Sequence, residues 1–117
     1  MENRRRIGTV QEERAAAFLS GLGYRILERN FRCKRGEIDL IAEEDGVLVF
    51  LEVKYRKSGC CGSPAEAVTR SKQRTICRVA DFYRMLKGIP ESRSCRFDVV
   101  AILGDEVQLY RNAFAYQ

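Results

Sequence analysis

The stretch from Gly36 to Lys54, GEIDLIAEEDGVLVFLEVK, constrains the fold more than any other part of the chain. It holds two runs of apolar, β-prone residues on either side of an acidic break, and the Asp-Gly pair in that break is a strong signal for a hairpin turn. The second run is apolar on both alternating faces, which is typical of a strand buried inside a sheet. The sequence therefore predicts a central hairpin.

Charged residues interrupt this apolar hairpin. Glu52 and Lys54 are two residues apart near the end of the second strand, so they point to the same face, and Glu37 and Asp39 share one face of the first strand. Such groups are costly to bury unless they are paired or bind a metal. The pattern D…ExK, formed by Asp39, Glu52 and Lys54, therefore fits two interpretations. One is a buried salt bridge between Glu52 and Lys54, and the other is a catalytic metal site.

The metal interpretation leads to a specific chemistry. Two carboxylates on adjacent strands repel each other, and Mg²⁺ (or Mn²⁺) offsets that charge while needing only one or two protein carboxylates, waters and a substrate phosphate oxygen. Such an ion activates water and polarises a phosphoryl oxygen. Lys54 would orient the water or stabilise the developing charge, and Lys72 or Gln73 would hold the water or a phosphate. This route needs no histidine, and the chain has none.

The rest of the chain supplies helices and further strands around the hairpin. Thr9-Val10-Gln11-Glu12 has the form of a capping box that opens a first helix, which leaves residues 1–8 as a flexible basic arm. A second helix is expected from the capping box at 63–66, with a second start at Thr69 and an end at Gly88. Further strands are expected at 24–31, 95–103 and 106–110. We predict one α/β domain over residues 1–117, an α-β-β-β-α-β-β sandwich with a mixed sheet.

Some polar features outside the hairpin fit two interpretations each. Glu12 either caps its own helix, which the sequence pattern alone favours, or reaches the metal from the helix end. Asp98 is an acid in an apolar strand, and pairing with Arg96 or a helix cation is favoured over a functional role. The basic face of the second helix is either solvated or in contact with phosphates, and the sequence favours neither.

Composition narrows the class of protein. The net charge of +5 and clustered arginines favour a polyanionic partner. The five cysteines are odd in number, lack a CxxC pair and have no histidine beside them, which argues against a zinc site and favours reduced thiols partly in the core. No P-loop motif is present. No apolar run approaches the roughly 20 residues that cross a bilayer, and no secretory signal is evident. These features predict a cytoplasmic protein with no membrane partner.

The segments GEIDLIA, VFLEVKYR, Ser-Pro-x-x-Ala-Val with Lys72, and CRFDVV resemble the YraN-like (UPF0102) family of small bacterial proteins, from Gly8 to about Phe114. That family is similar to the PD-(D/E)xK superfamily and to archaeal Holliday junction resolvases. The resemblance implies a restriction-endonuclease-like fold and a metal-dependent endodeoxyribonuclease that acts on branched or single-stranded DNA. A non-catalytic nucleic-acid-binding module of the same fold, or a structural domain with an internal ion pair, are the alternatives.

The resemblance also implies roles for individual residues. It makes Glu12, Asp39, Glu52 and Lys54 the catalytic set, with the three acids as ligands of Mg²⁺ or Mn²⁺, and so reverses the capping interpretation of Glu12. Junction-cutting relatives work as dimers, which implies a homodimer here, although the sequence shows no self-complementary apolar patch. The expected nucleic-acid contacts are Arg56, Lys72, Gln73 and Arg74.

Overall fold

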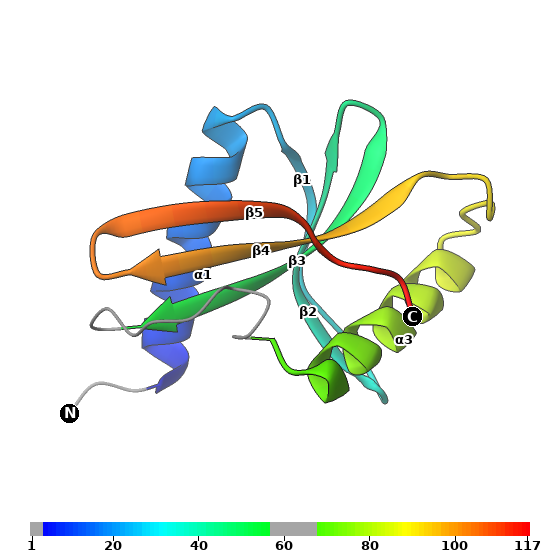
Figure 1. Cartoon of the computed structure of the whole chain (residues 1–117), viewed down its shortest axis with the longest axis horizontal. Helices are drawn as coiled ribbons and strands as arrows, with labels where there is room; N and C mark the ends of the chain where they lie inside the picture. Colours follow the sequence, from blue (N-terminus) through cyan, green and yellow to red (C-terminus); the bar gives the residue numbers. More distant parts are fainter. Residues whose placement is uncertain (1–3, 57–67) are drawn as a thin grey trace.

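The computed structural model describes residues 4–56 and 68–117, and in these it has two helices and a five-stranded sheet (Figure 1). Helix α1 spans Arg4–Gly21 and helix α3 spans Arg70–Leu86. The strands are β1 (Arg25–Cys33), β2 (Gly36–Glu44), β3 (Val47–Arg56), β4 (Cys95–Leu103) and β5 (Glu106–Phe114). The predicted α/β class and element order are confirmed.

The strands lie in the sheet in the order β1-β2-β3-β4-β5, so the chain builds the sheet from one edge to the other. Neighbouring strands are antiparallel except β3 and β4, which run parallel and are connected through α3. The predicted hairpin is the β2–β3 pair, with Leu40 opposite Leu51. Because β3 is the third of the five strands in this order, the strand that carries Glu52 and Lys54 is the centre of the sheet.

The two helices cover opposite faces of the sheet (Figure 1). Alternate residues of β3 point to opposite faces. Phe50 and its like-facing neighbours pack in a cluster with Ile76 and Tyr83 of α3, while Leu51 packs in a second cluster with Ala15 and Leu19 of α1. The predicted burial of β3 on both faces is therefore confirmed, and Glu52 shares the face that α3 covers.

Two element boundaries differ from the expectations. Helix α1 begins at Arg4, so residues 4–8 are helical where an arm was predicted, and Thr9 lies inside the helix rather than at its cap. Arginine is a good helix former, so the basic run extends the helix. Strand β5 continues past Tyr110 to Phe114, because its pairing with β4 resumes after a bulge and the Phe114 ring stacks on Phe97, with ring centroids 5.0 Å apart.

Other expectations are confirmed or lie outside the described residues. Thr69 is the N-cap of α3, and its Oγ1 accepts a hydrogen bond from the Lys72 backbone N–H at 3.1 Å. The helix opening predicted at 63–66 and the Cys60–Cys61 pair lie outside the described residues. Cys33, Cys77 and Cys95 are free thiols. Within the part of the chain that the structure describes, neither helix has the length and apolar character needed to span a membrane.

Candidate functional site

The fold brings the predicted carboxylates and lysines together on the face of the sheet that α3 covers. β3 provides Glu52 and Lys54, β2 provides Asp39, and the start of α3 provides Lys72. The Lys54 ammonium lies 3.8 Å from Glu52 Oε1, and the Lys72 ammonium lies 3.7 Å from the same oxygen. The backbone N–H of Val53, between Glu52 and Lys54, donates a 2.8 Å hydrogen bond to Asp39 Oδ2. This bond fixes Asp39 beside the end of the central strand.

Glu52 is the most buried charged group of this set, with 6% of its surface exposed. Burial raises its pKa to about 7, and the negative charge of Asp39 adds to the rise. The positive charges of Lys72 and Lys54 act in the opposite direction but do not cancel these effects. The cost of burying the ionised carboxylate, together with the charge of Asp39, therefore outweighs the attraction of the two lysines.

The pKa of Asp39 is raised as well. Burial raises its pKa above the ordinary aspartate value, and the charge of Glu37 raises it further. The hydrogen bond from Val53 and the charges of Lys72 and Lys54 lower the pKa, but the net change is upward. A divalent cation would stabilise the ionised forms of both Asp39 and Glu52, because its positive charge would offset part of the cost of burying them.

Glu12 reaches the neighbourhood of these groups from α1. Burial raises its pKa, and so do the charges of Asp39 and Glu37, whereas a hydrogen bond from the Asn30 side chain lowers it. Asn30 has a positive φ of 53° within β1, a conformation that asparagine tolerates better than most residues. Sequence reasoning did not find Asn30, and an asparagine inside a charged edge strand was the only signal for it.

The donor set fits a hard cation with few protein ligands. No group of three or more His, Cys, Asp or Glu side chains is arranged to hold a metal ion within residues 4–56 and 68–117. The ligand set of Glu12, Asp39 and Glu52 stays a prediction, and Asp39 and Glu52 are its two members on neighbouring strands. Two carboxylates with retained waters are sufficient for Mg²⁺, which is not bound by dedicated all-protein cages.

The four residues predicted to contact nucleic acid differ in their exposure and in their hydrogen-bond partners. Lys72 lies in the carboxylate cluster, and Arg74 is exposed on α3. Arg56 is exposed at the end of β3, where its guanidinium donates to the Tyr55 carbonyl at 3.1 Å. Gln73 is already engaged: its Nε2 donates to the Val68 carbonyl at 2.9 Å, and its Oε1 accepts from the Gln117 side chain at 2.7 Å. Its amide would have to exchange these partners to hold a water or a phosphate.

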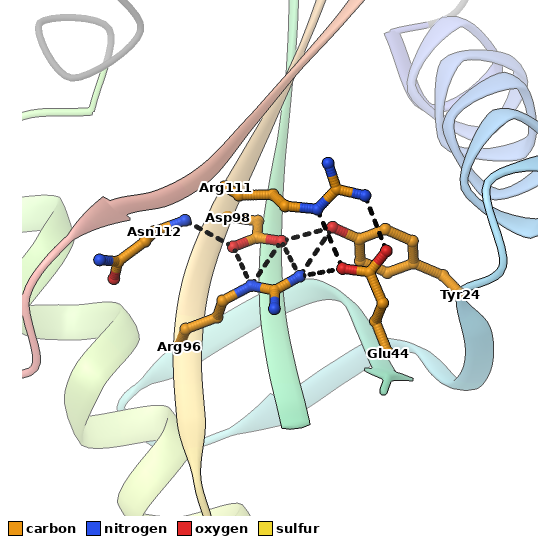
Figure 2. A network of polar contacts seen from close by, with 6 residues as sticks. All are labelled: Tyr24, Glu44, Arg96, Asp98, Arg111 and Asn112. Carbon is orange, nitrogen blue, oxygen red and sulfur yellow. Dashed lines mark hydrogen bonds and ion pairs between the residues drawn. The ribbon is translucent and has the colours of Figure 1, made fainter. Parts of the chain in front are cut away.

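Asp98 belongs to a separate polar network on the α1 side of the sheet (Figure 2). Its carboxylate accepts hydrogen bonds from the Tyr24 hydroxyl at 2.8 Å, from Arg96 Nε at 3.0 Å and from the Asn112 backbone N–H at 2.9 Å. Arg96 also contacts Glu44, which Arg111 binds from the other side. The predicted pairing of Asp98 with Arg96 is confirmed. The network joins Tyr24, which precedes β1, to strands β2, β4 and β5.

Comparison of the sequence with known proteins identifies the family of this chain. The sequence model of "Uncharacterised protein family UPF0102" matches residues 11–102. A UPF0102 protein of Lachnoclostridium phytofermentans is 50% identical over 112 residues, which cover 96% of this chain and 95% of that protein. One from Symbiobacterium thermophilum is 52% identical over 98 residues, covering 84% and 82%, and one from Caldicellulosiruptor saccharolyticus is 43% identical over 120 residues, covering 96% and 99%. The chain belongs to the UPF0102 family.

Proposed function

We propose that this protein is a metal-dependent nuclease that hydrolyses phosphodiester bonds in DNA, with Asp39, Glu52 and Lys54 at its centre. The observation that carries the proposal is the meeting of Asp39, Glu52, Lys54 and Lys72 at the end of the central strand. Two ammonium groups lie within 4 Å of the Glu52 carboxylate, yet its pKa is still raised to about 7. Burial is the main cause of this rise and the charge of Asp39 adds to it, so a cation bound beside Asp39 and Glu52 would favour the ionised form of Glu52.

Several features support DNA as the substrate. The chain carries a net charge of +5, and cations of β1, β3 and α3 surround the carboxylates. The element order α-β-β-β-α-β-β, with the acids and the lysine on the central strands, agrees with the restriction-endonuclease-like fold that the sequence motifs resemble. That agreement is an analogy of fold and adds to the site chemistry without replacing it.

The chain's own residues would divide the work as follows. Asp39 and Glu52 would hold Mg²⁺ or Mn²⁺, which when bound supplies an activated water and polarises the phosphoryl oxygen. Lys54, with 26% of its side chain exposed, reaches solvent beside Glu52 and would orient the attacking water or stabilise charge on the phosphoryl oxygens. Lys72, which shares the same carboxylate oxygen, would hold a neighbouring phosphate. Glu12 would add negative charge next to Asp39 from the α1 side.

The test is cleavage of labelled duplex, single-stranded, flap and four-way-junction DNA in Mg²⁺, in Mn²⁺ and in EDTA. We expect metal-dependent cutting that Asp39→Asn and Lys54→Ala abolish. Asp105→Asn and Lys87→Ala are matched controls, because Asp105 and Lys87 are exposed residues outside the carboxylate cluster, and both variants should cut like the wild type.

Calorimetric titration with Mn²⁺ separates metal binding from turnover. Asp39→Asn should lose affinity for the ion, while Asp105→Asn should keep it. A wild-type protein that binds DNA but cuts none of these forms with either metal would overturn the catalytic proposal in favour of a nucleic-acid-binding module.

A further inference from the structure

Two basic segments that are far apart in the sequence lie side by side in the fold. The turn between β1 and β2 carries Lys34 and Arg35, and it lies beside the first half of α3 (Figure 1). The contact is close at Gly36, where an added Cβ would come within 2.9 Å of Thr75 Cγ2. The missing side chain therefore allows this turn to approach α3, and it brings the cations of both elements to one surface.

The positive charges on this surface have no acidic partner among the residues that the structure describes. Lys34, Arg35, Arg70 and Arg74 are exposed, and none of them forms a salt bridge within residues 4–56 and 68–117. The first turn of α3 contains no acidic residue. Arg70 and Arg74 are spaced i,i+4, so their like charges repel each other. Elsewhere in the same ranges many arginines are paired, as Arg93 is with Glu43.

This surface adjoins the carboxylate cluster. The Lys72 ammonium is 3.7 Å from Glu52, and Thr75, which contacts the turn at Gly36, lies one helical turn further along α3. Glu37 follows Gly36 directly, and its charge raises the pKa of both Asp39 and Glu52. Side chains of the turn and of α3 thus flank the same acidic centre.

We propose that Lys34 and Arg35 of the β1–β2 turn, together with Arg70 and Arg74 of α3, form a surface that binds the sugar–phosphate backbone of nucleic acid beside the carboxylate cluster. The proposal rests on the proposed function for its substrate class. The cations are exposed and spread over two elements instead of converging on one pocket, which suits a chain of phosphates rather than a single anion. The proposal adds the β1–β2 turn to the predicted nucleic-acid contacts. The Gln73 amide is already hydrogen-bonded to Val68 and Gln117, so the exposed cations of the turn are better placed to bind phosphates.

The test measures binding of a fluorescein-labelled DNA duplex by anisotropy over a series of KCl concentrations, in EDTA, so that turnover plays no part. Each lost phosphate contact lowers the slope of log Kobs against log [salt] by about 0.9. We expect the double variant Lys34→Ala/Arg35→Ala to bind more weakly than wild type and to lower the slope by about 2. The control is Arg25→Ala/Lys87→Ala, which has the same net charge but alters the far ends of β1 and α3. It should keep the wild-type slope.

Equal slopes for the two double variants would overturn this inference, because the effect would then follow from net charge alone. The two proposals can fail separately. If the wild-type protein cuts no DNA while Lys34→Ala/Arg35→Ala weakens its salt-dependent binding, the nuclease proposal is refuted and the phosphate-binding surface is supported. Circular dichroism and urea unfolding establish that each variant is folded before its binding is interpreted.

Discussion

Replacement of Glu52 by glutamine should stabilise the metal-free protein at pH 8 and leave it almost unchanged near pH 4.5. The pKa of Glu52 is raised from 4.5 to about 7 by burial and by the charge of Asp39. Between these two values the unfolded chain has released the proton and the folded chain still holds it, so the free energy of unfolding falls as the pH rises. At about 1.4 kcal/mol for each pH unit, the cost reaches about 3 kcal/mol above pH 7. Glutamine does not ionise and avoids this cost.

Urea unfolding of wild type and Glu52→Gln in EDTA, at pH 5 and pH 8, measures the difference. Glu44→Gln is the matched control with the opposite sign, because a hydrogen bond from Arg111 and contacts with Arg96 lower the pKa of Glu44 to about 2, and its loss should destabilise the protein at both pH values. Added Mg²⁺ should reduce the difference in the free energy of unfolding between Glu52→Gln and wild type, because it binds the ionised site of the folded wild type. If Glu52→Gln is no more stable than wild type at pH 8, or if the difference does not change with pH, the argument that Glu52 is costly to ionise in the folded protein fails.

Two further substitutions test the packing around the site. Asp98→Ala should lower the free energy of unfolding by about 3–5 kcal/mol, because it removes the acceptor of Tyr24, Arg96 and the Asn112 N–H inside the sheet; a shift of the urea midpoint worth less than about 1 kcal/mol would contradict a structural role. Gly36→Ala should lower the free energy of unfolding by about 1–3 kcal/mol, since φ at this position is +150° and the new Cβ would lie 2.9 Å from Thr75 Cγ2. Adding Thr75→Ser to Gly36→Ala removes that methyl group and should recover part of the loss in thermal melts, whereas no recovery would assign the cost to the backbone alone.

The fold was predictable because its strongest signals are local. The Asp-Gly turn and the apolar runs around it specify the β2–β3 hairpin, and the run 95–103 specifies β4 with its observed boundaries. The predicted start of α1 was wrong. The capping-box pattern at Thr9 indicated a helix start there, but the arginines before it have a high helix propensity and the helix begins at Arg4. The end of β5 depends on stacking of Phe114 against Phe97, which comes from a different strand and leaves no local signal.

The candidate site was predictable to the extent that it depends on strand geometry. Spacing by two residues places Glu52 and Lys54 on one face, and the hairpin places Asp39 next to them. The approach of Lys72 to Glu52 depends on how α3 packs across the sheet, which no local pattern specifies. The engagement of Gln73 by Gln117, which is 44 residues further along the chain, likewise follows only from tertiary packing.

The described part of the sheet contains two clusters with buried carboxylates, and the clusters differ in the cations that contact them. On the α1 side, guanidinium groups contact Glu44 directly and hold its pKa at about 2, so that cluster is neutralised by the protein itself. On the α3 side, Glu52 has only ammonium groups at 3.7 and 3.8 Å, and its pKa moves in the opposite direction, to about 7. A chain that satisfies one acidic cluster with arginines could have satisfied the other in the same way. Ionised Glu52 is therefore costly to bury in the folded state, and a divalent cation bound as the proposed function requires would reduce that cost.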